Sequence, residues 1–168
     1  MSFDTALAKT LGFEGGVSEH PLDGGGLTKW GVTQQVYADW RRKQGLPERL
    51  VSEMTEPEMR AIYRDEYWKP AGCEHYPDEV AEAVFDMAVN SGATAAVRTL
   101  QRVLGITPDG VVGPMTIGGS HEGGPYVALK FLKARAGLYR DIVQRDPSQV
   151  VFLHGWINRL IDQAWRHA

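Results

Sequence analysis

Three side chains near the start of the chain, Glu14, Asp23 and Thr28, have the types and spacing needed for acid–base chemistry. Glu14 comes at the end of a short stretch expected to be helical, just before two glycines. A carboxyl group there faces the negative end of the helix dipole, and packing beside Phe13 would partly desolvate it. Both effects raise its pKa. A raised pKa keeps a carboxyl group protonated near neutral pH, as a general acid requires.

A glycine-rich loop separates Glu14 from Asp23 and would let the chain turn back, so that the two carboxyl groups face each other. One protonated and one ionised carboxyl group on opposite sides of a glycosidic bond can hydrolyse it. Thr28 could hold a water molecule or a sugar hydroxyl beside Asp23. The same residue types also occur as a solvated helix end, a turn residue and a helix cap. Spacing alone leaves both interpretations open.

Helical periodicity dominates the elements that must position these residues and predicts a mainly α fold. A small β-hairpin is expected within the glycine-rich segment 17–33, and "TPDGVVGP" is expected to form a turn or short hairpin. No linker is visible, so we expect a single compact domain over 1–168, with a catalytic part at 1–92 and a helical part at 93–168. The expected helices lie at 3–11, 33–45, 55–69, 78–90, 92–105, 125–145 and 149–166.

Local signals support several of these helices. Thr33 can cap the second helix, and Thr55 with Glu58 forms a capping box at the start of the third. The helix at 78–90 is apolar on nearly all sides, which predicts that it is buried. Asp86 within it therefore needs a partner and is expected to be structural.

Composition narrows the class of protein. The chain has 168 residues, 43% hydrophobic and 23% charged, as in a globular domain, and its net charge of −3 argues against non-specific nucleic-acid binding. The basic stretches 41–43 and 130–145 could suit an anionic polymer, although solvated helix faces are the favoured interpretation. Cys73 is the single cysteine, so no intrachain disulfide can form. The histidines lack metal-ligand spacing, and we expect neither a metal nor a cofactor.

No signal peptide and no apolar stretch long enough to span a membrane are apparent in the sequence. We therefore expect a protein that is synthesised in the cytoplasm and that needs another route to any site of action outside it. We also expect a monomer.

Five blocks, in order, cover almost the whole chain: "FEGGVSEHPLDGGGLTKWGVT" (13–33), "IYRDEYWKPAGC" (62–73), "VFDMAVNSG" (84–92), "LQRVLGITPDGVVGPMT" (100–116) and "HGWINRL" (154–160). Together they resemble glycoside hydrolase family 108, bacterial and phage N-acetylmuramidases of the lysozyme superfamily. The fourth block resembles a peptidoglycan-binding region of that family. The chain departs from the family pattern at Val17, where an aromatic residue is frequent, and at Gly24, where proline is usual.

The resemblance implies an α-helical lysozyme-like fold and hydrolysis of the β-1,4 bond between N-acetylmuramic acid and N-acetylglucosamine in peptidoglycan. It implies that Glu14 is the catalytic acid. Phage-type lysozymes have a similar order of Glu, Asp and Thr, which supports Asp23 and Thr28 by analogy. A phage or prophage endolysin, or a muramidase that serves secretion, would fit this activity, with the cell wall in the periplasm as its site of action after release.

Further residues are candidates for substrate binding: Trp30, Thr33, Tyr37 and Asn90. The aromatic rings could stack on sugars, although aromatic residues at helical spacing more often belong to the core. Asn90 could bind an N-acetyl group or cap the helix that it ends. Two other functions compete with hydrolysis: a lytic transglycosylase, which leaves an anhydro sugar, and a peptidoglycan-binding protein without activity.

Overall fold

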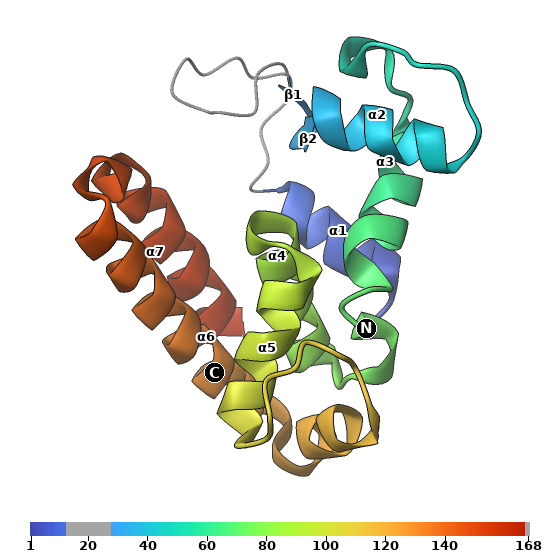
Figure 1. Cartoon of the computed structure of the whole chain (residues 1–168). Coiled ribbons are helices and arrows are strands. Elements are labelled where there is room, and N and C mark those ends of the chain that lie inside the picture. Colours follow the sequence, from blue (N-terminus) through green and yellow to red (C-terminus); the bar gives the residue numbers. More distant parts are fainter. Residues whose placement is uncertain (13–27, 167–168) are drawn as a thin grey trace. The chain divides into compact units, whose positions relative to one another are not determined.

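The structure is a computed structural model that describes residues 1–12 and 28–166, and in this part of the chain it is mainly helical (Figure 1). The chain divides into two compact units. One consists of Leu7–Glu66, and the other combines Met1–Ala6 with Tyr67–Ala168. The boundary between Ala6 and Leu7 falls inside helix α1 (Phe3–Leu11). The single domain expected over 1–168, with its parts at 1–92 and 93–168, stays a prediction.

The Leu7–Glu66 unit contains a short hairpin followed by helices. Its strands pair antiparallel, with Thr28 opposite Thr33 and Lys29 opposite Val32. This confirms a β-hairpin within the segment where one was expected. The described elements after α1 are β1 (Thr28–Lys29), β2 (Val32–Thr33), α2 (Gln34–Lys43), a 3-10 turn (Val51–Glu53) and α3 (Glu56–Ile62).

Both helices of this unit start at the caps that the sequence predicts. The Thr33 hydroxyl accepts a hydrogen bond from the Val36 N–H at 3.2 Å. Thr55 caps α3, and the Glu58 carboxylate in turn accepts from the Thr55 N–H at 2.8 Å. Each cap satisfies a backbone N–H that would otherwise lack a partner in the first turn. A π-helical turn (Tyr63–Trp68) follows α3.

Four helices make up most of the other unit, and Figure 1 shows α6 and α7 running back alongside each other. Helix α4 is buried from Val80 to Ala88, as expected for a helix that is apolar on nearly all sides. Gly92, at φ +85°, ends α4 and begins α5. The elements are a 3-10 turn (Cys73–His75), α4 (Asp78–Ser91), α5 (Ala93–Leu104), α6 (Pro114–Arg145), a second 3-10 turn (Pro147–Gln149) and α7 (Val150–Arg166).

Helix α6 differs from the expectation because it begins at Pro114 and not at 125. Its first part contains four glycines between Gly118 and Gly124, which have low intrinsic helix propensity and hide the helix from pattern analysis. Gly124 has non-helical angles (φ 42°, ψ −124°) and produces a kink just before Pro125. The expected helix at 125–145 is therefore the second arm of a longer, kinked one.

Aromatic rings and a buried thiol fill the space beside α4. The rings of Phe3, Trp68 and Phe85 meet edge to face, with centroids 5.3–6.0 Å apart, a favoured geometry for aromatic pairs. The thiol of Cys73 is 1% exposed, and burial raises its pKa well above the usual value.

Asp86 of α4 has the partners that its burial requires. Its carboxylate accepts a hydrogen bond from Arg135 Nη1 at 2.5 Å and from Arg159 Nε at 2.7 Å, which links α4 to α6 and α7. Burial acts to raise the pKa of Asp86, but the two guanidinium groups outweigh it and hold the pKa below its ordinary value. The structural role expected of Asp86 is confirmed.

No helix in residues 1–12 and 28–166 combines the length and apolar character that a membrane crossing requires.

Candidate active site

The two candidate carboxyl groups, Glu14 and Asp23, lie outside the described residues. Thr28, the third of the predicted catalytic residues, is described and is the first residue of β1. Its side chain is 9% exposed, and its strand partner is Thr33. The pairing fixes the position of Thr28 at the start of the hairpin. The catalytic roles of all three residues stay predictions.

Trp30 forms the turn of the hairpin together with Gly31. Both residues have positive φ angles, 50° and 74°, as a two-residue turn of type I′ requires. Trp30 is the only described residue other than glycine in this conformation, which costs a non-glycine residue about 1–3 kcal/mol and occurs preferentially at functional sites. The Tyr63 hydroxyl holds the turn by donating to the Trp30 carbonyl oxygen at 2.7 Å. The ring is half-buried, and Lys29 Nζ lies 4.6 Å from its centre.

Thr33 and Tyr37 both have structural contacts. The Thr33 hydroxyl is used in the cap of α2. The Tyr37 ring has no exposed surface, and its hydroxyl donates to Glu58 Oε1 at 3.1 Å while accepting from Arg41 Nη1 at 3.2 Å. Tyr37 therefore has the core role that helical spacing favours. Its contact with a sugar, like that of Thr33, remains only a prediction.

Asn90 lies in the other unit, one residue before the end of α4. Its side-chain amide donates to the carbonyl oxygen of Asp86 at 2.7 Å, an interaction within the last turn of the helix. The residue is exposed. This bond runs to a carbonyl inside the helix, whose C-cap residue is Gly92, so it is not a cap of the helix end. The contact of Asn90 with an N-acetyl group stays a prediction.

Sequence reasoning missed two side chains that hold the hairpin and α2 against the segment before α3. Lys29 Nζ donates to the carbonyl oxygens of Ser52 (2.9 Å) and Met54 (2.8 Å). The Gln34 amide donates to the Arg49 carbonyl (3.0 Å) and accepts from the Val51 N–H (2.7 Å). A lysine and a glutamine carry no sequence signal for such long-range bonds to the backbone.

A partly buried ion pair joins Arg41 of α2 to Glu58 of α3. The Glu58 carboxylate also accepts from the Thr55 N–H and hydroxyl and from the Tyr37 hydroxyl. Burial acts to raise its pKa, but these hydrogen bonds and the charge of Arg49 lower the pKa below its usual value. The group is therefore ionised at neutral pH and is unsuited to act as a general acid there.

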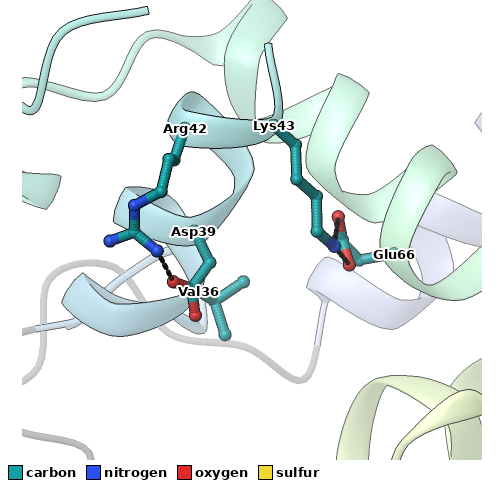
Figure 2. Close-up of a pocket in the computed structure, with 5 residues that line it drawn as sticks. All are labelled: Val36, Asp39, Arg42, Lys43 and Glu66. Atoms are coloured by element: carbon teal, nitrogen blue, oxygen red, sulfur yellow. Dashed lines mark hydrogen bonds and ion pairs between the residues drawn. The ribbon is translucent and has the colours of Figure 1, made fainter. Parts of the chain in front are cut away.

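The basic residues at 41–43 all have acidic partners. While Arg41 pairs with Glu58, Arg42 Nη1 lies 2.8 Å from Asp39 Oδ1, and Lys43 Nζ lies 2.8 Å from both oxygens of Glu66. These last four residues line a pocket of about 350 Å³ together with Val36 (Figure 2). Because the cations are neutralised pairwise, this face does not form a positive strip for an anionic polymer.

Metal binding finds no support in the described part of the chain, since residues 1–12 and 28–166 contain no cluster of three or more His, Cys, Asp or Glu side chains that could hold an ion.

Two segments of the chain match known protein families. The model of the family described as glycosyl hydrolase 108 matches residues 7–92, which is half of the chain and includes the hairpin, α2, α3 and α4. The chain belongs to glycosyl hydrolase family 108. Glu14, Asp23 and Thr28 all fall within the matched segment. A second family model, described as a predicted peptidoglycan domain, matches residues 95–161 of this family 108 enzyme.

Among solved structures, the chain is similar to SagA from Brucella abortus, with a TM-score of 0.84 and 28% sequence identity. The match covers 98% of this chain and 92% of the SagA chain. None of the curated protein sequences compared with the chain matches it. The protein is thus a glycoside hydrolase that acts on peptidoglycan, with a mainly helical, lysozyme-like fold and a small hairpin, as the sequence indicated.

Proposed function

We propose that this family 108 enzyme is an N-acetylmuramidase, which hydrolyses the β-1,4 bond between N-acetylmuramic acid and N-acetylglucosamine. The observation that carries the proposal is the family match over 7–92, because it includes an acid, a second acid and a hydroxyl in the order expected for a lysozyme. The peptidoglycan domain match over 95–161 supports the polymer as substrate.

In the proposed mechanism Glu14 protonates the oxygen of the leaving sugar. Asp23 stays ionised and either activates a water molecule or stabilises the positive charge that develops on the sugar ring. Thr28, held by its pairing with Thr33, orients the water or a substrate hydroxyl. Trp30 at the adjacent turn offers a half-buried ring to a sugar.

Mass spectrometry of muropeptides released from purified sacculi tests the proposal. The expected products carry a reducing muramic acid end. Anhydro-muramic acid would instead identify a lytic transglycosylase, and retention of the protein on sacculi without any products would identify a binding protein without activity.

The proposed roles of the site residues predict a graded loss of lysis. Glu14→Gln removes the proton donor while keeping the shape, so lysis should fall by about 100-fold or more while binding to sacculi persists. Asp23→Asn should reduce turnover steeply and Thr28→Ala less. Near-normal lysis by Glu14→Gln would overturn the assignment of the acid.

We also propose that the enzyme acts on the cell wall in the periplasm, as a phage or prophage endolysin or in secretion. The location of its substrate supports this. Expression of the chain with and without a co-expressed holin tests the export route: lysis that depends on the holin is expected for an endolysin, and lysis without it would contradict that role.

A further inference from the structure

The loop 105–113 between α5 and α6 is built around one buried amide, that of Gln101. The side chain of Gln101 is 2% exposed, and its Nε2 lies within hydrogen-bond distance of Asp109 Oδ1 (2.7 Å), the Val111 carbonyl (3.0 Å) and Thr116 Oγ1 (3.3 Å). Its oxygen accepts from the Gly110 N–H at 2.8 Å. The amide thus fixes the loop at 109–111 and joins it to Thr116 in the first turn of α6. A loop held in this way is preorganised, which lowers the cost of binding a ligand.

The loop and the start of α6 line a cavity of about 450 Å³ that is open to solvent. Four of the residues that line it are aliphatic: Ile106, Val111, Pro114 and Met115. Val111 is 66% exposed and Met115 71% exposed, so the rim presents apolar side chains to water on a rigid frame. Such an arrangement is a common feature of ligand sites.

Gly113 lines this cavity, although neither its backbone angles nor its packing requires a glycine there. Its φ of −131° and ψ of 179° are accessible to any residue, and a Cβ at this position would meet no atom within 4 Å. Gly113 is also the N-cap of α6 without a side-chain cap, where Ser, Asp or Asn would stabilise the helix. Helix α6 therefore lacks a capping side chain, although there is open space for one at this position.

Among the described residues that line the cavity, Asp109 is the only charged one. Its Oδ1 accepts from the Val111 N–H and from Gln101, and these bonds hold the pKa of Asp109 below its ordinary value, with a smaller effect from the charge of Arg98. Asp109 is therefore anionic at neutral pH. Its ligand should bring a cationic group, and the aliphatic rim should receive small apolar side chains.

We propose that this cavity binds the peptide stem of peptidoglycan, with the free amine of the diamino acid beside Asp109 and the alanine methyl groups against the aliphatic rim. None of the described lining residues is aromatic, so the cavity offers no ring face to a sugar. All lining residues fall within the segment that matches the peptidoglycan domain. The inference rests on the proposed function in that peptidoglycan is the polymer that supplies the peptide.

The test uses the full chain and the peptide L-Ala–γ-D-Glu–meso-diaminopimelate–D-Ala as the probe. Two-dimensional NMR of the amide groups should show shifts at Gly110 and Val111 on titration. Gly113→Phe adds a large side chain at a position that lines the cavity and should weaken binding at least tenfold. The matched control Gly118→Phe places the same ring in open space outside the cavity and should bind as the parent chain does.

Asp109→Asn provides a second variant that keeps the oxygen used by Val111 and Gln101 but removes the charge. It should weaken binding at least fivefold without changing the melting temperature by more than a few degrees. It therefore keeps the inference testable even if Gly113→Phe fails to fold. Unshifted loop amides, or equal affinity of the parent, Gly113→Phe and Asp109→Asn chains, would overturn the inference, as would preferential shifts with a peptide-free glycan tetrasaccharide.

Hydrolysis separates this inference from the proposed function. On intact sacculi Gly113→Phe should raise KM, whereas on glycan strands stripped of peptides by an amidase it should match the parent chain. If the parent chain releases no products from intact sacculi but still binds the peptide, the muramidase proposal fails and the peptide site stands. If stripped strands are hydrolysed and the peptide does not bind, the reverse holds.

Discussion

The Leu7–Glu66 unit and the helices α4–α7 are stabilised in different ways. In the first, single polar side chains such as Lys29 and Gln34 reach across to backbone groups of an irregular segment. In the second, an almost wholly buried helix packs among its neighbours, and one buried charge cluster around Asp86 ties three helices together. The first unit contains the hairpin next to the predicted catalytic loop. The unit that carries the proposed chemistry is thus held by polar contacts to the backbone, whereas the other unit is held by a buried helix and a buried charge cluster.

The largest expected effect comes from removing α6 and α7. A chain ending at Gly105 would expose the faces of α4 and α5 that these helices cover, at about 25 cal/mol per Å² of lost apolar burial. Typical total stability is only about 5–15 kcal/mol. We expect residues 1–105 to be insoluble or unfolded by circular dichroism. A soluble, cooperatively melting and active fragment would show that the N-terminal part folds independently.

The next effect should come from Asp86. Replacing it in Asp86→Asn leaves two buried guanidinium groups without their counter-charge, which is expected to cost about 3–5 kcal/mol in urea unfolding. Asp162→Asn is the matched control, because its side chain is 55% exposed and pairs only at the surface. Equal stability of the two variants would mean that the cluster contributes little.

Low pH should remove the same contribution in the parent chain. The folded-state pKa of Asp86 lies below its ordinary value of 3.8, so its stabilising effect is complete above that value and is lost as the pH falls below it. The difference in unfolding free energy between the parent chain and Asp86→Asn should therefore shrink below about pH 4. A difference that stays constant down to pH 2 would contradict the assignment.

A smaller effect is expected in the other unit from Glu58→Ala, which breaks the pair with Arg41 and the capping box of α3. We expect a loss of about 1.5–3 kcal/mol, the usual range for hydrogen bonds to a charged group. Glu48→Ala serves as the control, because its side chain is 77% exposed. If both variants melt alike, the polar contacts of Glu58 do not stabilise this unit.

The smallest effect should come from Thr33. Thr33→Ala should cost about 1 kcal/mol through loss of the α2 cap, and Thr33→Asn should restore it because asparagine is a good N-cap. Measuring KM on sacculi with Thr33→Asn then separates the cap from the predicted sugar contact. An unchanged KM assigns Thr33 to capping alone, and a raised KM with restored stability supports the contact.

Local signals allowed much of the fold to be predicted from the sequence. The caps at Thr33 and Thr55 and the buried α4 follow from residues a few positions apart. The partners of Asp86 could not be predicted, because Arg135 and Arg159 are 49 and 73 residues away and many arginines would serve as well. The first part of α6 was missed because packing overrides the poor helix propensity of its glycines. At the candidate site, the roles of Thr28 and Trp30 stay predictions, and the sequence did not show that Tyr37 is fully buried, because burial depends on residues distant in the chain.

The buried thiol of Cys73 can be used to measure local opening of the folded chain. A neutral, enclosed thiol reacts slowly with alkylating reagents, because the thiolate is the reactive species and needs access to the reagent. With one cysteine in the chain, every labelling event in a time course comes from this position. The rate of labelling in native buffer thus measures how frequently the part of the molecule around Cys73 opens. Because the thiol is enclosed and neutral, we also expect the folded protein to form no mixed disulfides in an oxidising compartment.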